Sequence, residues 1–366
     1  MFAQTSLPGP AIQRVGTNGA DVELKLGSTT GNTYRVFRSA TMAANSWQDT
    51  GVSAPGTGAL LTLTVPGTGS LTKQFFRIEA TLTTGPGFVA IGGGAFIMGD
   101  QSVAQEGNPN EHPAIEVGTG GYQIKAHEVT KAEWDATAAY AGANGYTFSS
   151  NAGQGKAADH PVHSVSWYDV VKWCNAKSEQ DGLEPCYFNG VAIYKTGSPS
   201  TVTWNPVMNG YRLPCESEWE KAARGGLVAK RFPGGDLINH SLANYVANPA
   251  AYTYDTNASS GSHPTYSTGA TPYTSPAGSF SPNGAGLYDM AGNLLEWCWD
   301  DIQANEYQNG YVIDLTSGSS TRQRVVRGGS WLGQAAVARV SRRGSAFPDT
   351  GKGNDVGFRI VRGSLQ

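Results

Sequence analysis

The sequence predicts a small all-β sandwich-like module over residues 1–84, followed by an α+β domain with long loops over residues 85–366. Before residue 84, apolar residues alternate with a period of two, which is typical of half-buried strands. After residue 88, three helix-start signals appear. Across the whole chain glycine accounts for 48 residues and charged residues for only 15%. Such a composition favours a turn-rich globular protein over a helical bundle.

Four alternating runs predict the strands of the first module. They cover residues 21–26, 34–38, 61–65 and 75–80, and turns rich in glycine and proline separate several of them. No helical pattern interrupts the series, so a small sandwich is expected. The segment 83–87, TTGPG, is the predicted linker.

Three helices are predicted in the second domain. Thr130 followed by Glu133 is a capping box, and Ser166 followed by Asp169 is a second one. The third helix is expected over residues 216–224, because a Gly-Gly pair follows it as a C-terminal cap. A last extended run, residues 356–361, closes the domain.

Charge and hydropathy exclude two classes of partner. The formal net charge is −3 and no basic stripe with interleaved aromatics occurs, which argues against nucleic acid. No run of 18 apolar residues is present, so no membrane span is expected. The first residues, MFAQT, are too short for a signal peptide but match the remnant of a trimmed one, or an arbitrary starting point. We expect a secreted, periplasmic or cell-surface bacterial protein whose signal peptide is not in this chain.

A series of ordered motifs runs through the second domain. They are residues 88–99 (FVAIGGGAFIMG), 127–130 (HEVT), 160–162 (HPV), 165–169 (VSWYD), 211–214 (YRLP), 218–220 (EWE), 222–226 (AARGG), 286–289 (GLYD), 292–297 (GNLLEW), 327–331 (RGGSW) and 357–359 (GFR). In this order they resemble the sulfatase-modifying-factor, or formylglycine-generating, family over residues 88–362. The resemblance implies an elaborated C-type-lectin-like α+β fold.

The resemblance also implies a chemistry whose key residues are missing. The family's enzymes oxidise a substrate cysteine with O2 and copper, which two cysteines bind, three and eight residues beyond the serine of the RGGS motif. Ser330 is retained here, but those two positions are Gly333 and Ala338. Without thiolates no copper is expected. We therefore expect a non-catalytic binding protein; the alternatives are formylglycine generation by other residues, or another chemistry in the same groove.

The chain has four cysteines in motifs remote in sequence from Ser330. Given the expected export, we favour two disulfides, Cys174–Cys186 and Cys215–Cys298. The alternatives are four buried free thiols or a relocated copper site.

The resemblance further implies structural calcium. One loop would supply side-chain oxygens from Asp289 and Glu296 and carbonyl oxygens from Gly292 and Leu294. The alternative is a tight turn in which the same residues are hydrogen-bonded. A weaker second site would use Asn244 and the carbonyl of Tyr245, but no carboxylate stands at the expected place in the loop that follows.

Because the two cysteines are absent, the resemblance implies that the segment after the RGGS motif is a binding surface. The expected partner is an extracellular protein or a glycan. The candidate contact residues are Trp331, Gln334, Arg339, Arg342, Arg343 and Phe347. The alternative is that the arginines pair internally, with Asp349 or Asp355.

Overall fold

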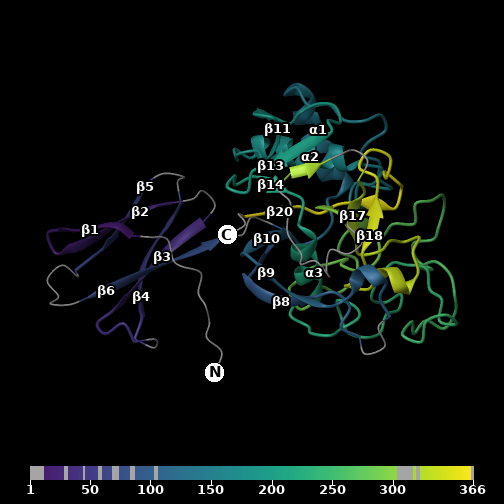
Figure 1. Ribbon diagram of the computed structural model, residues 1–366, viewed down its shortest axis with the longest axis horizontal. Coiled ribbons are helices and arrows are strands. Elements are labelled where there is room, and N and C mark those ends of the chain that lie inside the picture. Colours follow the sequence, from purple (N-terminus) through teal and green to yellow (C-terminus); the bar gives the residue numbers. More distant parts are fainter. Residues whose placement is uncertain are drawn as a thin grey trace. The chain divides into compact units, whose positions relative to one another are not determined.

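The computed structural model describes residues 12–28, 32–43, 46–56, 60–67, 74–82, 87–102, 106–302, 316–318 and 322–363. The chain divides into two compact units, Met1–Gly85 and Pro86–Gln366 (Figure 1). Each unit is described by itself.

The first unit consists of two three-stranded antiparallel sheets. One has the order β1-β2-β5 and the other β4-β3-β6. The strands are β1 (Ile12–Asn18), β2 (Asp21–Gly27), β3 (Asn32–Ser39), β4 (Gln48–Pro55), β5 (Leu60–Val65) and β6 (Phe75–Leu82). Leu24 of β2 lies opposite Leu63 of β5, and both side chains are buried in the core of the unit. The four strands predicted from the alternation are confirmed as β2, β3, β5 and β6.

The alternation did not predict β1 and β4. Both are edge strands, but so are β5 and β6, so edge position alone does not explain the difference. Most residues of β1 are exposed and none is fully buried, so the strand shows no clear apolar period. Such strands are visible only once their partners are known.

The three helices of the second unit begin where the sequence predicts. They are α1 (Lys131–Ala143), α2 (Trp167–Gln180) and α3 (Glu216–Arg224). Thr130 and Ser166 cap α1 and α2 by accepting the backbone N–H three residues later. Gly225 ends α3 with φ +54°, in the left-handed region that glycine reaches without steric cost.

Short strands form the rest of the regular structure. One sheet has the order β14-β20-β10-β7, a second β12-β11-β13-β16, a third β18-β17-β15-β19, and β8 pairs with β9. All pairs are antiparallel except β15 with β19. The bounds are β7 (Phe88–Ile91), β8 (Gly94–Met98), β9 (Ile115–Thr119), β10 (Tyr122–Lys125), β11 (Tyr187–Asn189), β12 (Ala192–Ile193), β13 (Thr201–Trp204), β14 (Tyr211–Arg212), β15 (Leu295–Asp301), β16 (Thr316–Gly318), β17 (Arg324–Arg327), β18 (Gly344–Ala346), β19 (Val356–Gly357) and β20 (Val361–Arg362), with 3-10 turns η1 (Pro109–Glu111) and η2 (Ala335–Ala338). The single strand expected over residues 356–361 is thus two short strands in different sheets.

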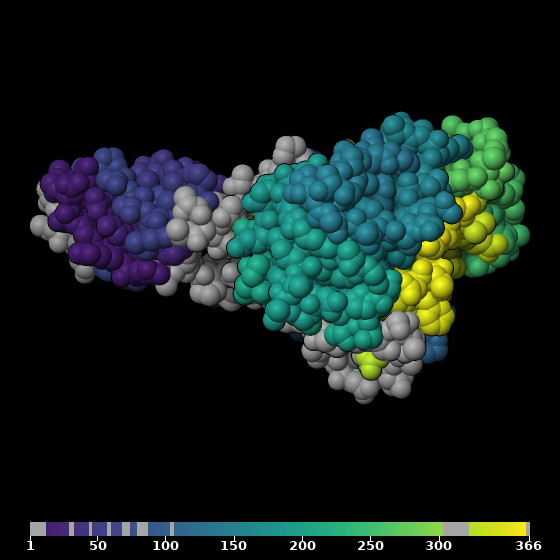
Figure 2. Space-filling model, turned by 90° about the horizontal axis from the view of Figure 1, so that it is seen from above, coloured from purple at the N-terminus to yellow at the C-terminus, as the bar shows by residue number. Residues whose placement is uncertain are grey.

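The core of the second unit surrounds α2. Trp173 of α2 stacks on Trp134 of α1 at 6.1 Å between ring centroids, and Phe358 packs edge-on against both rings. Residues 225–294 contain no helix or strand and share a smaller apolar cluster with Ala335 and Ala338. No helix in the described residues is long and apolar enough to cross a membrane. In the space-filling view the C-terminal segment (yellow) reaches the surface between the teal and green parts of this unit (Figure 2).

His163, in the loop before α2, makes stability depend on pH. The side chain is 5% exposed, and burial lowers its pKa to about 4. The unfolded chain takes up this proton near pH 6.5, whereas the folded chain does so only near pH 4. The free energy of unfolding is therefore expected to decrease as the pH is lowered from about 6.5 to about 4, by up to about 3 kcal/mol. Urea unfolding at pH 8 and pH 5 tests this: His163→Gln should lose less stability than the wild type, and equal losses would contradict it.

Candidate functional site

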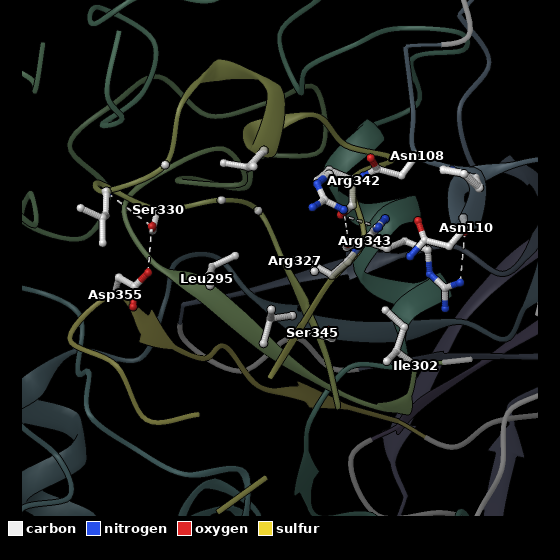
Figure 3. A pocket seen from close by; sticks show the side chains of 18 residues that line it. Asn108, Asn110, Leu295, Ile302, Arg327, Ser330, Arg342, Arg343, Ser345 and Asp355 are labelled. Atoms are coloured by element: carbon white, nitrogen blue, oxygen red, sulfur yellow. Dashed lines mark hydrogen bonds between the residues drawn. The ribbon is translucent and has the colours of Figure 1, made fainter. Parts of the chain in front are cut away.

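A cavity of about 790 Å³ lies where the RGGS motif leaves β17 (Figure 3). Val326 and Arg327 of β17, Leu295 of β15 and Ser345 of β18 line it from one sheet. The loop after Ser330 and the η1 segment complete the wall. The site is therefore built by segments that are far apart in the sequence.

The two ends of the cavity differ in chemistry. At one end Ser330 Oγ donates to Asp355 Oδ2 at 3.3 Å. At the other end lie Arg342, Asn108 and Asn110, and Figure 3 shows them opposite the Ser330–Asp355 pair. Between the ends, Leu295 and Val326 contribute apolar surface beside the polar side chains of Arg327 and Ser345.

Most arginines around the cavity are paired with buried glutamates. Arg343 donates to both carboxylate oxygens of Glu216, at 2.7 and 2.8 Å, and Arg339 to both oxygens of Glu111, at 2.8 and 3.0 Å. Arg327 forms an ion pair with Glu220. These fork-to-fork contacts fix the wall of the cavity.

Most of the predicted contact residues do not face this cavity. Trp331 is 4% exposed and packs edge-on against Tyr273, while Gln334 and Phe347 lie outside the lining. Arg339 lies outside the lining and Arg343 is part of it, but both guanidiniums are engaged by buried glutamates. Only Arg342 remains as a candidate. Internal pairing of the arginines is observed, but with Glu111 and Glu216 instead of Asp349 or Asp355.

Gly333 and Ala338, where the resemblance would place the family's two cysteines, have different surroundings. Gly333 lines the cavity, and a Cβ built there would lie 2.4 Å from Val337 Cγ2. Ala338 is buried in an apolar cluster together with Tyr245 and Phe232. Neither position supplies a nucleophile, and the space beside Gly333 is occupied by an aliphatic side chain.

The four cysteines are buried free thiols, so the expected disulfides Cys174–Cys186 and Cys215–Cys298 are not formed. Three of them belong to the main core cluster and Cys298 to a neighbouring one, where they pack as small apolar side chains. Burial raises the pKa of all four, that of Cys186 to about 12. Protonated thiols at these positions are poor nucleophiles.

Thiol titration is expected to find no reactive cysteine in the native protein and four after unfolding. All four side chains are 0% exposed, so a reagent reaches them only when the core opens. Protein prepared without reductant should be treated with a thiol reagent in buffer and in denaturant. Fewer than four thiols in denaturant would contradict the free-thiol arrangement.

The predicted calcium loop is partly closed by an arginine. Arg359 donates to both carboxylate oxygens of Glu296 at 2.6 Å, and Trp219 Nε1 donates to Oε2 at 2.7 Å. Glu296 is therefore already engaged. Within the described ranges, no group of three or more His, Cys, Asp or Glu side chains is placed to hold a metal ion.

Asp289 fits a cation better than Glu296 does. Its Oδ2 accepts the N–H of Gly278 at 2.6 Å, whereas its buried Oδ1 has no hydrogen-bond partner. Burial raises the pKa of Asp289 to about 6 and that of nearby Glu128 well above its usual value, with Asp289 and Glu296 adding to the shift of Glu128. A hard cation at Oδ1 would offset this excess of buried carboxylates.

The residues predicted for the weaker calcium site make hydrogen bonds within the protein. Asn244 Nδ2 donates to the Tyr273 carbonyl at 2.8 Å, and His240 Nε2 donates to the Tyr245 carbonyl at 3.0 Å. Asp255 accepts the Tyr245 hydroxyl and the backbone N–H groups of Asn248 and Asn257. The Tyr245 carbonyl oxygen and the Asp255 carboxylate therefore already accept hydrogen bonds within the loop.

Sequence reasoning missed several residues of the cavity. Asn108 and Asn110 flank Pro109 at η1, and their only local signal is a turn. Asp355 was considered only as a partner for arginines. Asn110 meets Arg343 across 233 residues and Asp355 meets Ser330 across 25, and no local pattern records either contact.

The sulfatase-modifying factor enzyme 1-like domain model matches residues 74–364. The formylglycine-generating enzyme of Streptomyces coelicolor is 32% identical over 298 residues, which cover 75% of this chain and 88% of that protein. The chaperone protein LppX of Paenibacillus barcinonensis is 29% identical over 293 residues, 76% of this chain and 90% of that protein.

Solved structures agree with the sequence relatives. CarF superposes with a TM-score of 0.55 at 27% identity and covers 75% of this chain and 97% of its own. PvdO from Pseudomonas aeruginosa gives 0.53 at 25% identity, over 75% of this chain and 94% of its own. The α+β fold expected for the second domain is therefore confirmed.

Proposed function

We propose that this chain, which belongs to the sulfatase-modifying factor enzyme 1-like family, binds a polypeptide in the cavity beside Ser330 without modifying it covalently. One observation carries the proposal. At Gly333 the cavity wall is backbone packed against Val337, so the cavity persists without a thiol beside it.

The lining supports a polypeptide ligand. It combines apolar side chains with polar groups at separate places, the arrangement that fixes the orientation of a bound chain. One relative, 90% of which is covered by the match, is named a chaperone protein, which agrees with a polypeptide partner. A glycan is the competing ligand class.

Binding to peptide and glycan arrays tests the proposal. Ser345 is exposed and lines the cavity, so Ser345→Trp should obstruct it and abolish peptide binding. Ser259 is exposed and lies outside the lining, and Ser259→Trp is the matched control that should keep binding. Glycan binding alone, or peptide binding that survives Ser345→Trp, would reject the proposal.

Absence of covalent chemistry is tested separately. A cysteine-containing sulfatase-motif peptide is incubated with the protein, copper and O2, and its mass is followed. We expect an unchanged thiol, because neither Gly333 nor Ala338 can bind Cu(I). Loss of the thiol with gain of an aldehyde would establish an oxidase.

Calcium at Asp289 is part of the proposal. Calcium at 100 times its dissociation constant is expected to stabilise the protein by about 2.7 kcal/mol relative to chelator. Asp289→Ala should remove this gain, while Asp236→Ala, at an exposed carboxylate, should keep it. Equal melting temperatures of the wild type in calcium and in chelator would contradict the site.

We also propose that the protein acts outside the bacterial cytosol. The low content of charged residues and the added β-sandwich unit support this location. Fractionation of the source cells with an antibody tests it, and recovery only in the cytosol would reject it.

A further inference from the structure

Arg342 differs from the other arginines around the cavity. Arg327, Arg339 and Arg343 each pair with a buried glutamate. The guanidinium of Arg342 donates to the backbone carbonyl of Arg343 and has no carboxylate partner among the described residues. It is therefore the cation at this wall whose charge the fold leaves without a direct counterion.

The surroundings of Arg342 favour an added anion. Burial lowers the pKa of its guanidinium. The charge of Glu111 raises this pKa, whereas the charges of Arg339 and Arg327 lower it further. Arg342 lines the cavity together with Asn110, whose buried Oδ1 has no hydrogen-bond partner. Rotation of that amide would present its NH2 group as a second donor.

We propose that the Arg342 end of the cavity recognises a carboxylate of the bound ligand. The inference rests on the proposed polypeptide ligand, since a carboxylate is the anionic group that an unmodified polypeptide supplies, from Asp, Glu or the C-terminus. A guanidinium and a carboxylate match in planar, two-pronged geometry, and a partly buried pair is stronger than one in water. Ligands therefore enter with an acidic group toward Arg342 and the opposite end toward Ser330 and Asp355.

Charge-neutral replacement on both sides tests the contact. Peptides that bind the wild type are remade with each Asp or Glu changed to Asn or Gln, and with an amidated C-terminus. One such change is expected to weaken binding to the wild type at least about tenfold. The same change should alter binding to Arg342→Gln less than about twofold, because the partner charge is already absent.

Two controls guard against trivial losses. Lys230→Gln removes an equal charge from an exposed lysine paired with Asp236, and should behave as the wild type. The melting temperature of Arg342→Gln shows whether the fold is retained. Equal affinities of the acid and amide peptides for the wild type, or equal sensitivity in Arg342→Gln, would overturn the inference.

A small probe separates this inference from the proposed function. The Nε–H signal of Arg342 is identified by its absence from Arg342→Gln and followed by NMR during titration with glutarate. We expect a saturable shift that glutaramide does not cause. A glutarate shift without any peptide binding would reject the polypeptide ligand and retain the carboxylate site. Peptide binding without a glutarate shift would reject the carboxylate site and retain the proposed function.

Discussion

Glu216→Gln is expected to lower the free energy of unfolding by about 3–5 kcal/mol. Glu216 is the first residue of α3 and is fully buried. Its two carboxylate oxygens accept Arg343 Nε and Nη2, and Oε1 lies 3.4 Å from Arg327 Nη1. Glutamine keeps the shape but removes the charge that two buried guanidiniums share. Urea unfolding of both proteins measures the difference.

The control is an ion pair at the surface. Asp236 and Lys230 lie 2.6 Å apart, but both side chains are close to half exposed. Asp236→Asn is therefore expected to cost less than about 1 kcal/mol. If Glu216→Gln costs no more than Asp236→Asn, the buried network does not hold this wall of the cavity together.

Gly292→Ala is expected to destabilise the protein by about 2–4 kcal/mol, from left-handed strain and overpacking together. Gly292 has φ +81°, and a Cβ there would lie 2.3 Å from the carbonyl oxygen of Asn244. The Gly292 N–H also donates to the Gly328 carbonyl at 2.8 Å, beside the turn that leads to Ser330. The added methyl group must therefore separate backbone segments, because no flexible side chain can yield.

Gly269→Ala isolates the conformational part of this effect. Gly269 has a similar φ of +74°, and nothing lies within 4 Å of its Cβ position. That substitution is expected to cost about 1 kcal/mol. The difference between the two variants, measured by thermal unfolding, reports the steric contact. Equal costs would show that the Asn244–Gly292 contact relaxes without loss.

The features that the sequence predicts are those with short-range causes. The capping box of α1 joins Thr130 to Glu133, and the end of α3 needs only Gly225. Strands β2, β3, β5 and β6 of the first unit follow from alternation because both sheets bury one face. Each signal lies within a few residues of the element that it predicts.

The pairing of charges could not be predicted in this way. Arg339 pairs with Glu111, 228 residues away, and Arg343 with Glu216, 127 residues away. The sequence offers nearer carboxylates, Asp349 and Asp355, and local reasoning selects them. The packing of η1, α3 and β17 determines which arginine lacks a carboxylate partner. Arg342 can therefore be distinguished from the others only in the three-dimensional structure.

The burial of all four thiols makes the native surface suitable for selective chemical labelling. The wild-type protein carries no exposed sulfhydryl group, so a cysteine introduced at Ser345 would be the one readily labelled position. A fluorophore attached there would sit at the cavity lining without any need to remove native cysteines. A change in its emission would then report ligand binding in the cavity. The core would keep its four native cysteines.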